Sequence, residues 1–380
     1  MLAGLVERGE YVGVATILSR HDHTHIDTIG YQDRERRIPM RRDTIFRIAS
    51  MTKPITAVAA MILVEESKVG LDEPIERFLP ELANRQVLRR SDGPLDDTEP
   101  ASRALTLRDL LTFRMGFGSL MLPPNSCPIQ RAETALALRE LKPILPHTPD
   151  EWIRCFGTLP LMCQPGEQWL YHTGSDVLGV LIARAAGQSF ETFLSQRIFD
   201  PLGMKDTGFY TPADKLNRFA SLYELNAHNG LDLDDDALDS KWNHPPSFAA
   251  GGGGLVSTMD DYLAFCRMLM HKGRFGRERI LTRPTVEFMV MDHLTPEQKA
   301  ASAFFPGFWE SQGWGLGVSV VTRRASIAMV PGQYGWGGHF GTQWRSDPGE
   351  DLIAIMMTQR SGFGPLGMDF LALVYQAIDD

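Results

Sequence analysis

The amino-acid sequence predicts a mixed α/β fold of the α+β type, in which strands at both ends of the chain enclose a mostly helical middle. Apolar and β-branched residues are concentrated in short runs near the two ends, whereas apolar residues at helical spacing dominate between them. A chain of 380 residues is long enough for two domains. We therefore expect a mixed α/β domain that contains the sheet, formed by residues 1–75 and 245–380, and a mostly helical domain inserted at residues 76–244.

The N-terminal part begins with strands. Short apolar and β-branched runs predict them at residues 11–18, 28–31 and 44–49. The apolar run 55–64 then predicts a buried helix, with Gly70 as its C-cap. Residues 84–104 are polar and contain glycine and proline, so we expect a loop there.

Helices and then strands follow along the rest of the chain. Further helices are predicted after a cap at Thr106, over residues 175–186 up to Gly187, after a cap at Ser257 or Thr258, and over residues 370–378. The acidic residues 228–247 predict another loop. The last strands are predicted at residues 316–321, 342–345 and 352–357.

Composition and charge argue against several kinds of partner. A net charge of −9 disfavours a nucleic acid or an anionic membrane surface as the main partner. No uninterrupted apolar run is long enough to span a bilayer. The first ten residues lack the basic stretch and apolar core of a secretory signal, so we expect a cytoplasmic protein.

No metal site is predicted. The four cysteines show no metal-binding or redox spacing, and we expect them to be reduced and structural. His21, His23 and His25 alternate and would share one face of a strand. No carboxylate or cysteine cluster follows them, which favours an exposed hairpin face over a metal site.

The most informative motif is Ser50-Met51-Thr52-Lys53, which lies between a predicted strand and a predicted helix. A spacing of three residues puts the serine and the lysine on one helical face. The lysine can take the serine proton once its surroundings favour the neutral amine, and the helix start offers free N–H groups to an oxyanion. This pattern indicates an acylating serine hydrolase of the S-x-x-K kind. Taken alone, it also fits a capping serine followed by a solvated lysine.

Two further segments bear chemistry. Tyr171 ends an extended stretch just before a predicted helix, and a tyrosine beside a lysine ammonium can act as a base. The alternative is a core tyrosine whose hydroxyl is satisfied. Residues 336–341 are glycine-rich, which allows a backbone edge to approach a ligand and supply an N–H group, or simply makes a turn between strands.

In combination these segments resemble the serine β-lactamase and penicillin-binding-protein-like family, and most of all class C-type β-lactamase relatives and family VIII carboxylesterases. The resemblance covers nearly the whole chain and rests on residues 43–54, 110–112, 164–166, 251–255 and 336–338. It implies a β-lactamase-like fold: a central antiparallel sheet flanked by helices, a mostly helical domain, and an active site in the cleft between them. It further implies Ser50 as nucleophile, Lys53 and Tyr171 as the proton-transfer pair, and the N–H groups of Ser50 and His339 as the oxyanion hole.

The sequence departs from the β-lactamase pattern at two positions. Tyr171-His172-Thr173 stands where those enzymes carry Tyr-x-Asn, and threonine cannot present the donor and acceptor of an amide. Trp336-Gly337-Gly338 stands where they carry Lys-Thr-Gly, so the lysine that attracts a substrate carboxylate is absent. Both changes resemble the esterase-like members. In an alternative frame, His339-Phe340-Gly341 resembles a His-Thr-Gly motif, and the N–H of Thr342 completes the oxyanion hole.

The sequence thus predicts a serine hydrolase that forms an acyl-enzyme, needs no cofactor, and acts as a carboxylesterase on small acyl or aryl esters. The predicted pocket and substrate-binding residues are Phe117, Thr173, Trp336, Gly337, Gly338 and His339, with residues 304–309 as further aromatic wall. The alternatives are a β-lactamase or D-amino-acid peptidase acting on amides, an acyltransferase, and a non-catalytic sensor that is acylated once. In each case the partner is a small-molecule ester or amide, and the sequence leaves the oligomeric state open.

Overall fold

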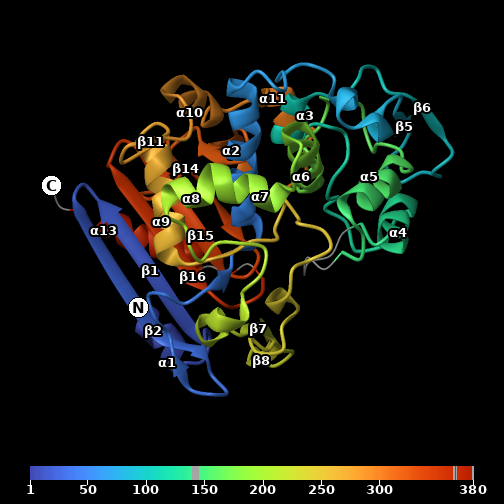
Figure 1. Ribbon diagram of the computed structural model, residues 1–380. Helices are drawn as coiled ribbons and strands as arrows, with labels where there is room; N and C mark the ends of the chain where they lie inside the picture. Colours follow the sequence, from blue (N-terminus) through green and yellow to red (C-terminus); the bar gives the residue numbers. More distant parts are fainter. Residues whose placement is uncertain (139–144, 363, 365, 379–380) are drawn as a thin grey trace.

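The computed structural model describes residues 1–138, 145–362, 364 and 366–378. An antiparallel sheet of eight strands lies at its centre, in the order β12-β13-β14-β15-β16-β1-β2-β3. These strands are β1 (Gly13–Arg20), β2 (His23–Asp33), β3 (Ile38–Pro39), β12 (Gln312–Trp314), β13 (Ser319–Val321), β14 (Tyr334–Gly338), β15 (Thr342–Asp347) and β16 (Leu352–Thr358). Strand β1 pairs with β16 from Val14–Thr358 to Arg20–Leu352, so the two ends of the chain meet inside one sheet. Figure 1 shows the blue N-terminal strands beside the red C-terminal ones.

Helices cover both faces of the sheet, because successive strand residues point to opposite faces. On one face, Ala15 and Ile355 belong to the main hydrophobic core with the helices α2 (Thr52–Glu65) and α9 (Met259–Met270). On the other face, Val14 and Met356 pack with α1 (Leu2–Glu7) and α13 (Leu366–Gln376).

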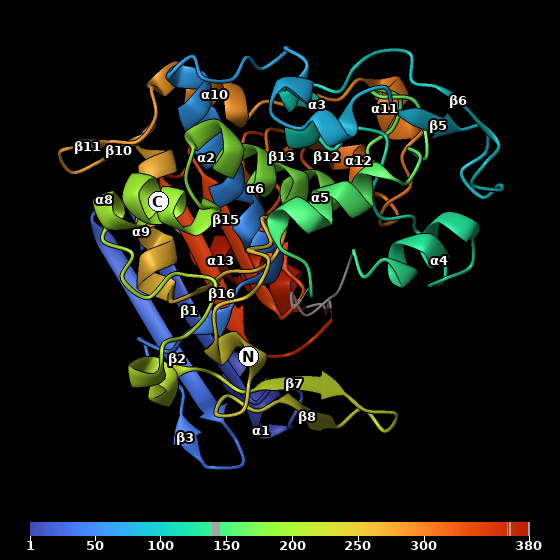
Figure 2. The same ribbon diagram turned by 45° about the vertical axis from the view of Figure 1, so that its right-hand side comes forward.

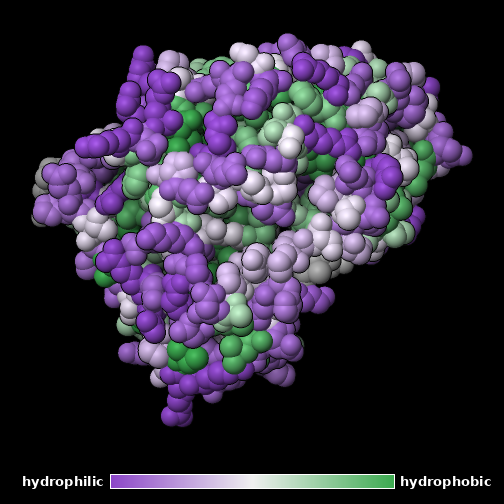
Figure 3. Space-filling model, viewed as in Figure 1, coloured by the Kyte–Doolittle hydropathy of each residue, from purple (hydrophilic) through white to green (hydrophobic). Residues whose placement is uncertain are grey.

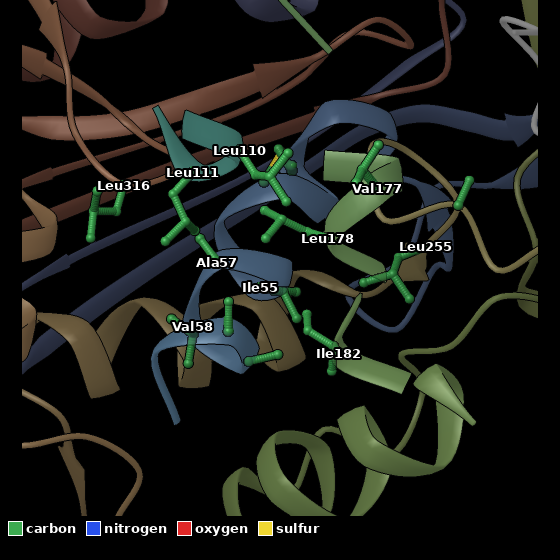
Figure 4. Close-up of a cluster of buried hydrophobic side chains, with 14 of the residues drawn as sticks. Ile55, Ala57, Val58, Leu110, Leu111, Val177, Leu178, Ile182, Leu255 and Leu316 are labelled. Carbon is green, nitrogen blue, oxygen red and sulfur yellow. The ribbon is translucent and has the colours of Figure 1, made fainter. Parts of the chain in front are cut away.

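Helix α2 runs through the centre of the main core. Every residue from Thr52 to Leu63 is buried, as expected for a helix that is apolar on all sides. It packs against α6 (Thr173–Ala186), and α6 packs in turn against α3 (Leu107–Leu111). Figure 4 shows Ile55 and Val58 of α2 in one cluster with Leu178 and Ile182 of α6.

Shorter elements surround this framework. The remaining α-helices are α4 (Pro128–Ala135), α5 (Pro149–Gly157), α7 (Phe190–Leu194), α8 (Asp200–Leu202), α10 (Arg283–Met289), α11 (Pro296–Ala300) and α12 (Phe308–Ser311). Four two-stranded pairs are β4 (Phe46–Arg47) with β9 (Val256–Ser257), β5 (Gln86–Leu88) with β6 (Thr98–Pro100), β7 (Leu222–Leu225) with β8 (Leu231–Asp235), and β10 (Arg274–Phe275) with β11 (Glu278–Arg279). In Figure 2, α4, α5, β5 and β6 lie together on the side away from β1 and β2.

Several local predictions from the sequence are confirmed. Thr106 accepts a hydrogen bond from the Asp109 N–H in a capping box, and Thr258 caps α9. Gly187 ends α6 in the left-handed conformation, with φ of 69°.

Other local predictions are wrong. Helix α2 ends at Glu65, because Ser67 takes the left-handed conformation (φ 54°) that the sequence assigned to Gly70. The expected loop at 84–104 contains the β5–β6 hairpin, and the acidic segment 228–247 contains β8. Strands β5 and β6 have three residues each, and β8 alternates leucine with aspartate, so a reading based on apolar runs does not detect them.

The surface is predominantly polar on the face shown in Figure 3, where hydrophobic side chains are exposed in small separate patches. Within the described ranges, no helix has the length and apolar character needed to cross a membrane. All four cysteines are free thiols.

Candidate active site

The turn that carries Ser50 is held by contacts with two other segments, α9 and β14. Ser50 lies in the 3-10 turn η1 (Ala49–Met51), directly before α2. Ala49 has a φ of 44°, a costly conformation for a residue with a side chain. The Met51 carbonyl accepts a hydrogen bond of 3.0 Å from the Tyr262 hydroxyl of α9. On the other side, Gly338 of β14 lies so close that an added Cβ would be 2.3 Å from the Ile48 carbonyl oxygen.

Lys53 is completely buried, one helical turn after Ser50. Its Nζ lies 3.0 Å from Ser50 Oγ and 3.0 Å from His172 Nδ1, and it also donates to the carbonyl oxygen of Gly252. An ammonium group has three N–H donors, so these three acceptors satisfy it fully. Its charge also lies 4.6 Å from the centroid of the Tyr171 ring, a cation–π contact.

His172 and Asp176 form a second layer behind the lysine. His172 Nε2 lies 3.2 Å from Asp176 Oδ2, and the Gly252 N–H donates to Asp176 Oδ1 at 2.8 Å. Burial acts to raise the pKa of Asp176, but the charge and hydrogen bond of His172, with the charge of Lys53, lower it below its usual value. Asp176 is therefore an ionised carboxylate in the interior.

Tyr171 is fixed by aromatic neighbours. Its hydroxyl accepts a hydrogen bond of 2.6 Å from Trp336 Nε1 of β14. Its ring meets Phe113 edge to face, with centroids 5.5 Å apart and an interplanar angle of 85°. Trp169 stacks on the same ring at 5.5 Å. The structure thus brings Ser50, Lys53 and Tyr171 together, as the sequence predicts.

A cavity of about 560 Å³ opens beside Ser50. Of the predicted site residues, Ser50, Tyr171, Trp336, Gly337 and His339 line it, and Phe304, Phe305 and Phe308 add an aromatic wall. Burial lowers the pKa of His339 below its usual value, against the opposing effect of Asp234. The histidine at this wall is therefore neutral at pH 7.

Three predicted pocket residues do not line the cavity. Phe117 is fully buried and packs edge to face on Phe156 in the main core, so its assignment to the pocket is wrong. Thr173 is buried at the first position of α6. Gly338 is turned toward the Ile48 carbonyl, behind the cavity wall. An aromatic or small side chain fits a core as well as a pocket, and its type does not distinguish them.

Sequence reasoning missed His172, Asp176 and Gly252 as site residues. Asp176 follows His172 by four residues, a spacing that allows contact on one helical face. This local signal could have revealed the pair. The contacts to Lys53 and Gly252 join segments that are far apart in the sequence, so only the fold reveals them.

In the ranges that the structure describes, no group of three or more histidine, cysteine or acidic side chains is placed to hold a metal ion. What the site offers is a hydroxyl within hydrogen-bond reach of a buried amine, next to an enclosed apolar space. With this fold, such a site places the protein among the serine hydrolases.

Comparison with known proteins gives the family. The Beta-lactamase family matches residues 1–375, and the chain belongs to it. The protein Rv1367c of Mycobacterium tuberculosis (strain H37Rv) is 41% identical over 353 residues, which are 91% of this chain and 85% of that protein. A lovastatin esterase of Penicillium rubens is 32% identical, over 83% of this chain and 80% of its own.

Solved structures show the same fold. EstCE1, described as a hydrolase with promiscuous acyltransferase activity, superposes with a TM-score of 0.81. It is 24% identical, and the match covers 98% of this chain and 96% of EstCE1. The β-lactamase-like fold expected from the sequence is therefore confirmed.

Proposed function

We propose that the protein is a carboxylesterase that cleaves small acyl or aryl esters through an acyl-enzyme on Ser50. The observation that carries this proposal is the distance of 3.0 Å between Lys53 Nζ and Ser50 Oγ at the edge of an aromatic cavity. Its relation to the lovastatin esterase supports an ester rather than an amide substrate.

In the proposed acylation step, Ser50 Oγ attacks the ester carbonyl carbon while its proton passes to a neutral Lys53 amine. The proton then reaches the leaving alkoxide by way of Lys53 and the Tyr171 hydroxyl, as the C–O bond of the ester breaks. In deacylation, water attacks the acyl carbon and passes one proton to Lys53 and Tyr171. The bond between the acyl carbon and Ser50 Oγ then breaks, and Ser50 Oγ takes that proton back from the same two residues. Each half-reaction therefore releases every proton that it takes up.

The oxyanion is proposed to bind between the N–H groups of Ser50 and His339. His339 lines the cavity next to Ser50, which supports this frame of the glycine-rich motif. In the alternative frame the backbone N–H of Thr342 would donate, but Thr342 does not line the cavity. Donors held rigidly at such a position are worth about 3 kcal/mol each in the transition state.

The cavity wall favours esters with apolar groups. Phe304, Phe308 and Trp336 present ring faces and edges to the space, with 4.9 Å between the centroids of the two phenylalanines. Burial of apolar surface against such a wall stabilises a bound acyl or aryl group by roughly 25 cal/mol per Å².

The test is hydrolysis of p-nitrophenyl butyrate by the wild type, Ser50→Ala, and Ser91→Ala as a matched serine control in an exposed loop. We expect Ser50→Ala to lose activity by about 10³-fold or more and Ser91→Ala to retain it. Mass spectrometry of the intact wild type should show a butyryl adduct that Ser50→Ala lacks. Equal rates for wild type and Ser50→Ala would refute the nucleophile. A wild type that spares esters but cleaves nitrocefin would favour the β-lactamase alternative.

An acyltransferase is the second candidate, because EstCE1 combines both activities. The two outcomes differ only in what attacks the acyl-enzyme. Product analysis with an added alcohol decides between them: butyric acid alone indicates a hydrolase, and a new butyrate ester indicates transfer.

A further inference from the structure

We propose that His172 and Asp176 act as a proton acceptor for Lys53 and so generate the neutral amine that the reaction needs. The inference rests on the proposed function. His172 and Asp176 are assigned here as positioning and proton-holding residues that act through Lys53.

The tautomer of His172 follows from its partners. Asp176 is an ionised, acceptor-only carboxylate, so His172 Nε2, at 3.2 Å from it, carries a hydrogen. In a neutral imidazole the other nitrogen then has a lone pair. That lone pair, on Nδ1, lies 3.0 Å from Lys53 Nζ, which therefore donates.

Of the three acceptors around Lys53, His172 is the one that can keep a proton. A carbonyl oxygen and a serine hydroxyl accept hydrogen bonds but are far too weakly basic to hold the proton. In the proposed step the N–H bond at Lys53 Nζ breaks and an N–H bond forms at His172 Nδ1. The imidazolium is stabilised by Asp176, and the new lone pair on Nζ faces Ser50 Oγ at 3.0 Å.

The charges of the site remain balanced through the reaction. Before substrate attack, Lys53 and His172 share one positive charge, because two cations 3.0 Å apart repel strongly. Asp176 compensates that charge. When the Ser50 proton reaches Lys53, a second positive charge appears together with the oxyanion of the tetrahedral intermediate. Among the described residues, Lys53, Asp176 and Tyr171 are the titratable groups shown in contact with His172.

The backbone is strained to hold this arrangement. His172 has φ of 88° and ψ of −68°, and the Thr173 N–H reaches back to the Tyr171 carbonyl at 3.3 Å, a γ-turn of the disfavoured hand. A Cβ on Gly252 would be 2.9 Å from Asp176 Oδ1 and 3.0 Å from His172 Cε1, so the pair packs against bare backbone. A histidine serving only to fill space would not require such a turn.

The first test is the pH profile of p-nitrophenyl butyrate hydrolysis by His172→Asn, Asp176→Asn and the control His271→Asn, whose histidine is exposed at the end of α9. Asparagine keeps an acceptor near the Nδ1 position but holds no proton. We expect His172→Asn to lower kcat about 10- to 100-fold at pH 7 with KM nearly unchanged, and to recover toward the wild-type rate above pH 9, where solvent removes the lysine proton. Asp176→Asn should shift the profile in the same direction.

A profile of wild-type shape for His172→Asn would overturn the inference, as would a loss that is uniform at all pH values. A second measurement does not depend on turnover: nitrogen NMR of labelled histidine in Ser50→Ala. The His172 resonances should change in Lys53→Met if the two groups share a proton. Absence of that change would refute the pair even in an active enzyme, whereas its presence in an enzyme without esterase activity would refute only the proposed function.

A separate observation concerns the substrate, and from it we infer that the cavity accepts esters that carry a second, ionised carboxylate. Arg345 lines the same cavity as Ser50. Its guanidinium donates to Ser319 Oγ at 2.6 Å and to Gln312 Oε1 at 3.1 Å, both neutral oxygens. Burial lowers the pKa of Arg345 to about 10, so it is still a cation at pH 7.

The position of Arg345 follows from the sheet. Arg345 of β15 is paired with Gly335 of β14, and Ser319 of β13 is paired with the same glycine. Because Gly335 has no side chain, the arginine crosses over β14 to reach Ser319. Within the described part of the chain, the guanidinium uses two of its five N–H donors in these contacts, which leaves donors for a carboxylate.

The test compares p-nitrophenyl hemiesters of dicarboxylic acids with four to ten carbons against their neutral methyl-capped counterparts. We expect Arg345→Met to lower kcat/KM for the best hemiester at least tenfold and to leave the capped ester within twofold, while Arg345→Lys keeps part of the preference. Arg277→Met, in the exposed β10–β11 turn, is the control. Equal losses on both substrates, or no preference at any length in the wild type, would overturn the inference. Adipate binding to Ser50→Ala, measured by calorimetry with dimethyl adipate as control, tests the subsite without turnover.

Discussion

At the scale of single residues, Arg47 shows how the surroundings of Ser50 are anchored. It lies three residues before Ser50 with its side chain 2% exposed, and it forms an ion pair with Asp235 of β8. Burial lowers the pKa of Arg47 to about 10, although Asp235 opposes the shift. Its guanidinium also stacks 4.0 Å from the centroid of the Phe219 ring. The buried Arg47 cation therefore links the acidic β7–β8 hairpin to β4, the strand that precedes the Ser50 turn.

We expect Asp235→Asn to destabilise the fold by about 3–5 kcal/mol, because it leaves the Arg47 charge buried without its counter-ion. The measurement is urea unfolding followed by tryptophan fluorescence. Asp239→Asn, an exposed carboxylate in the same segment, is the matched control and should change stability by less than about 0.5 kcal/mol. Indistinguishable midpoints for the two variants would contradict the anchoring role of the ion pair.

At the scale of elements, strand β14 forms part of the wall of the site. Its two consecutive glycines, Gly337 and Gly338, have different surroundings. An added Cβ on Gly338 would lie 2.3 Å from the Ile48 carbonyl oxygen and 2.4 Å from Thr342 Oγ1. On Gly337 the nearest atom would be the Thr342 carbonyl oxygen at 3.3 Å, and this glycine lines the cavity. The close approach of β14 to the Ser50 turn therefore depends on Gly338.

The pair gives a matched test of this contact. Gly338→Ala should destabilise the protein by about 1–3 kcal/mol and lower kcat, since the strand must move away from the Ser50 turn. Gly337→Ala should lower the melting temperature less than Gly338→Ala, because its closest contact is 3.3 Å, and should act chiefly on KM. Both effects can be read from thermal unfolding and p-nitrophenyl butyrate kinetics. Equal melting temperatures for the two variants would show that β14 adapts without cost.

At the scale of the whole molecule, the sequence predicts structural features that depend on neighbouring residues. It does not predict contacts between residues that are distant along the chain. The caps Thr106 and Thr258 were predictable because a cap bonds to the next turn. The gathering of Ser50, Lys53 and Tyr171 was predictable through the family resemblance. Phe117 was misplaced because an aromatic side chain fits either the core or the cavity.

The antiparallel sheet shows the same limit. Apolar runs indicate strands, yet nothing local to residues 13–20 shows that they pair with residues 352–358. The contact of His172 with Lys53 likewise appears only once α6 lies against α2. The family resemblance supplied such long-range contacts for the fold. It did not supply the contact of His172, which stands at the unspecified middle position of the Tyr-x-Asn motif.

The pairing of β1 with β16 also governs when the protein can acquire its activity. Val14 can pair with Thr358 only after Thr358, which lies far later in the chain, has been synthesised. Before that point the edge of β1 that pairs with β16 has no partner strand, and the Ser50 turn lacks β14 against it. The Ser50 turn is therefore synthesised long before β14 and β16, the strands that complete the sheet beside it.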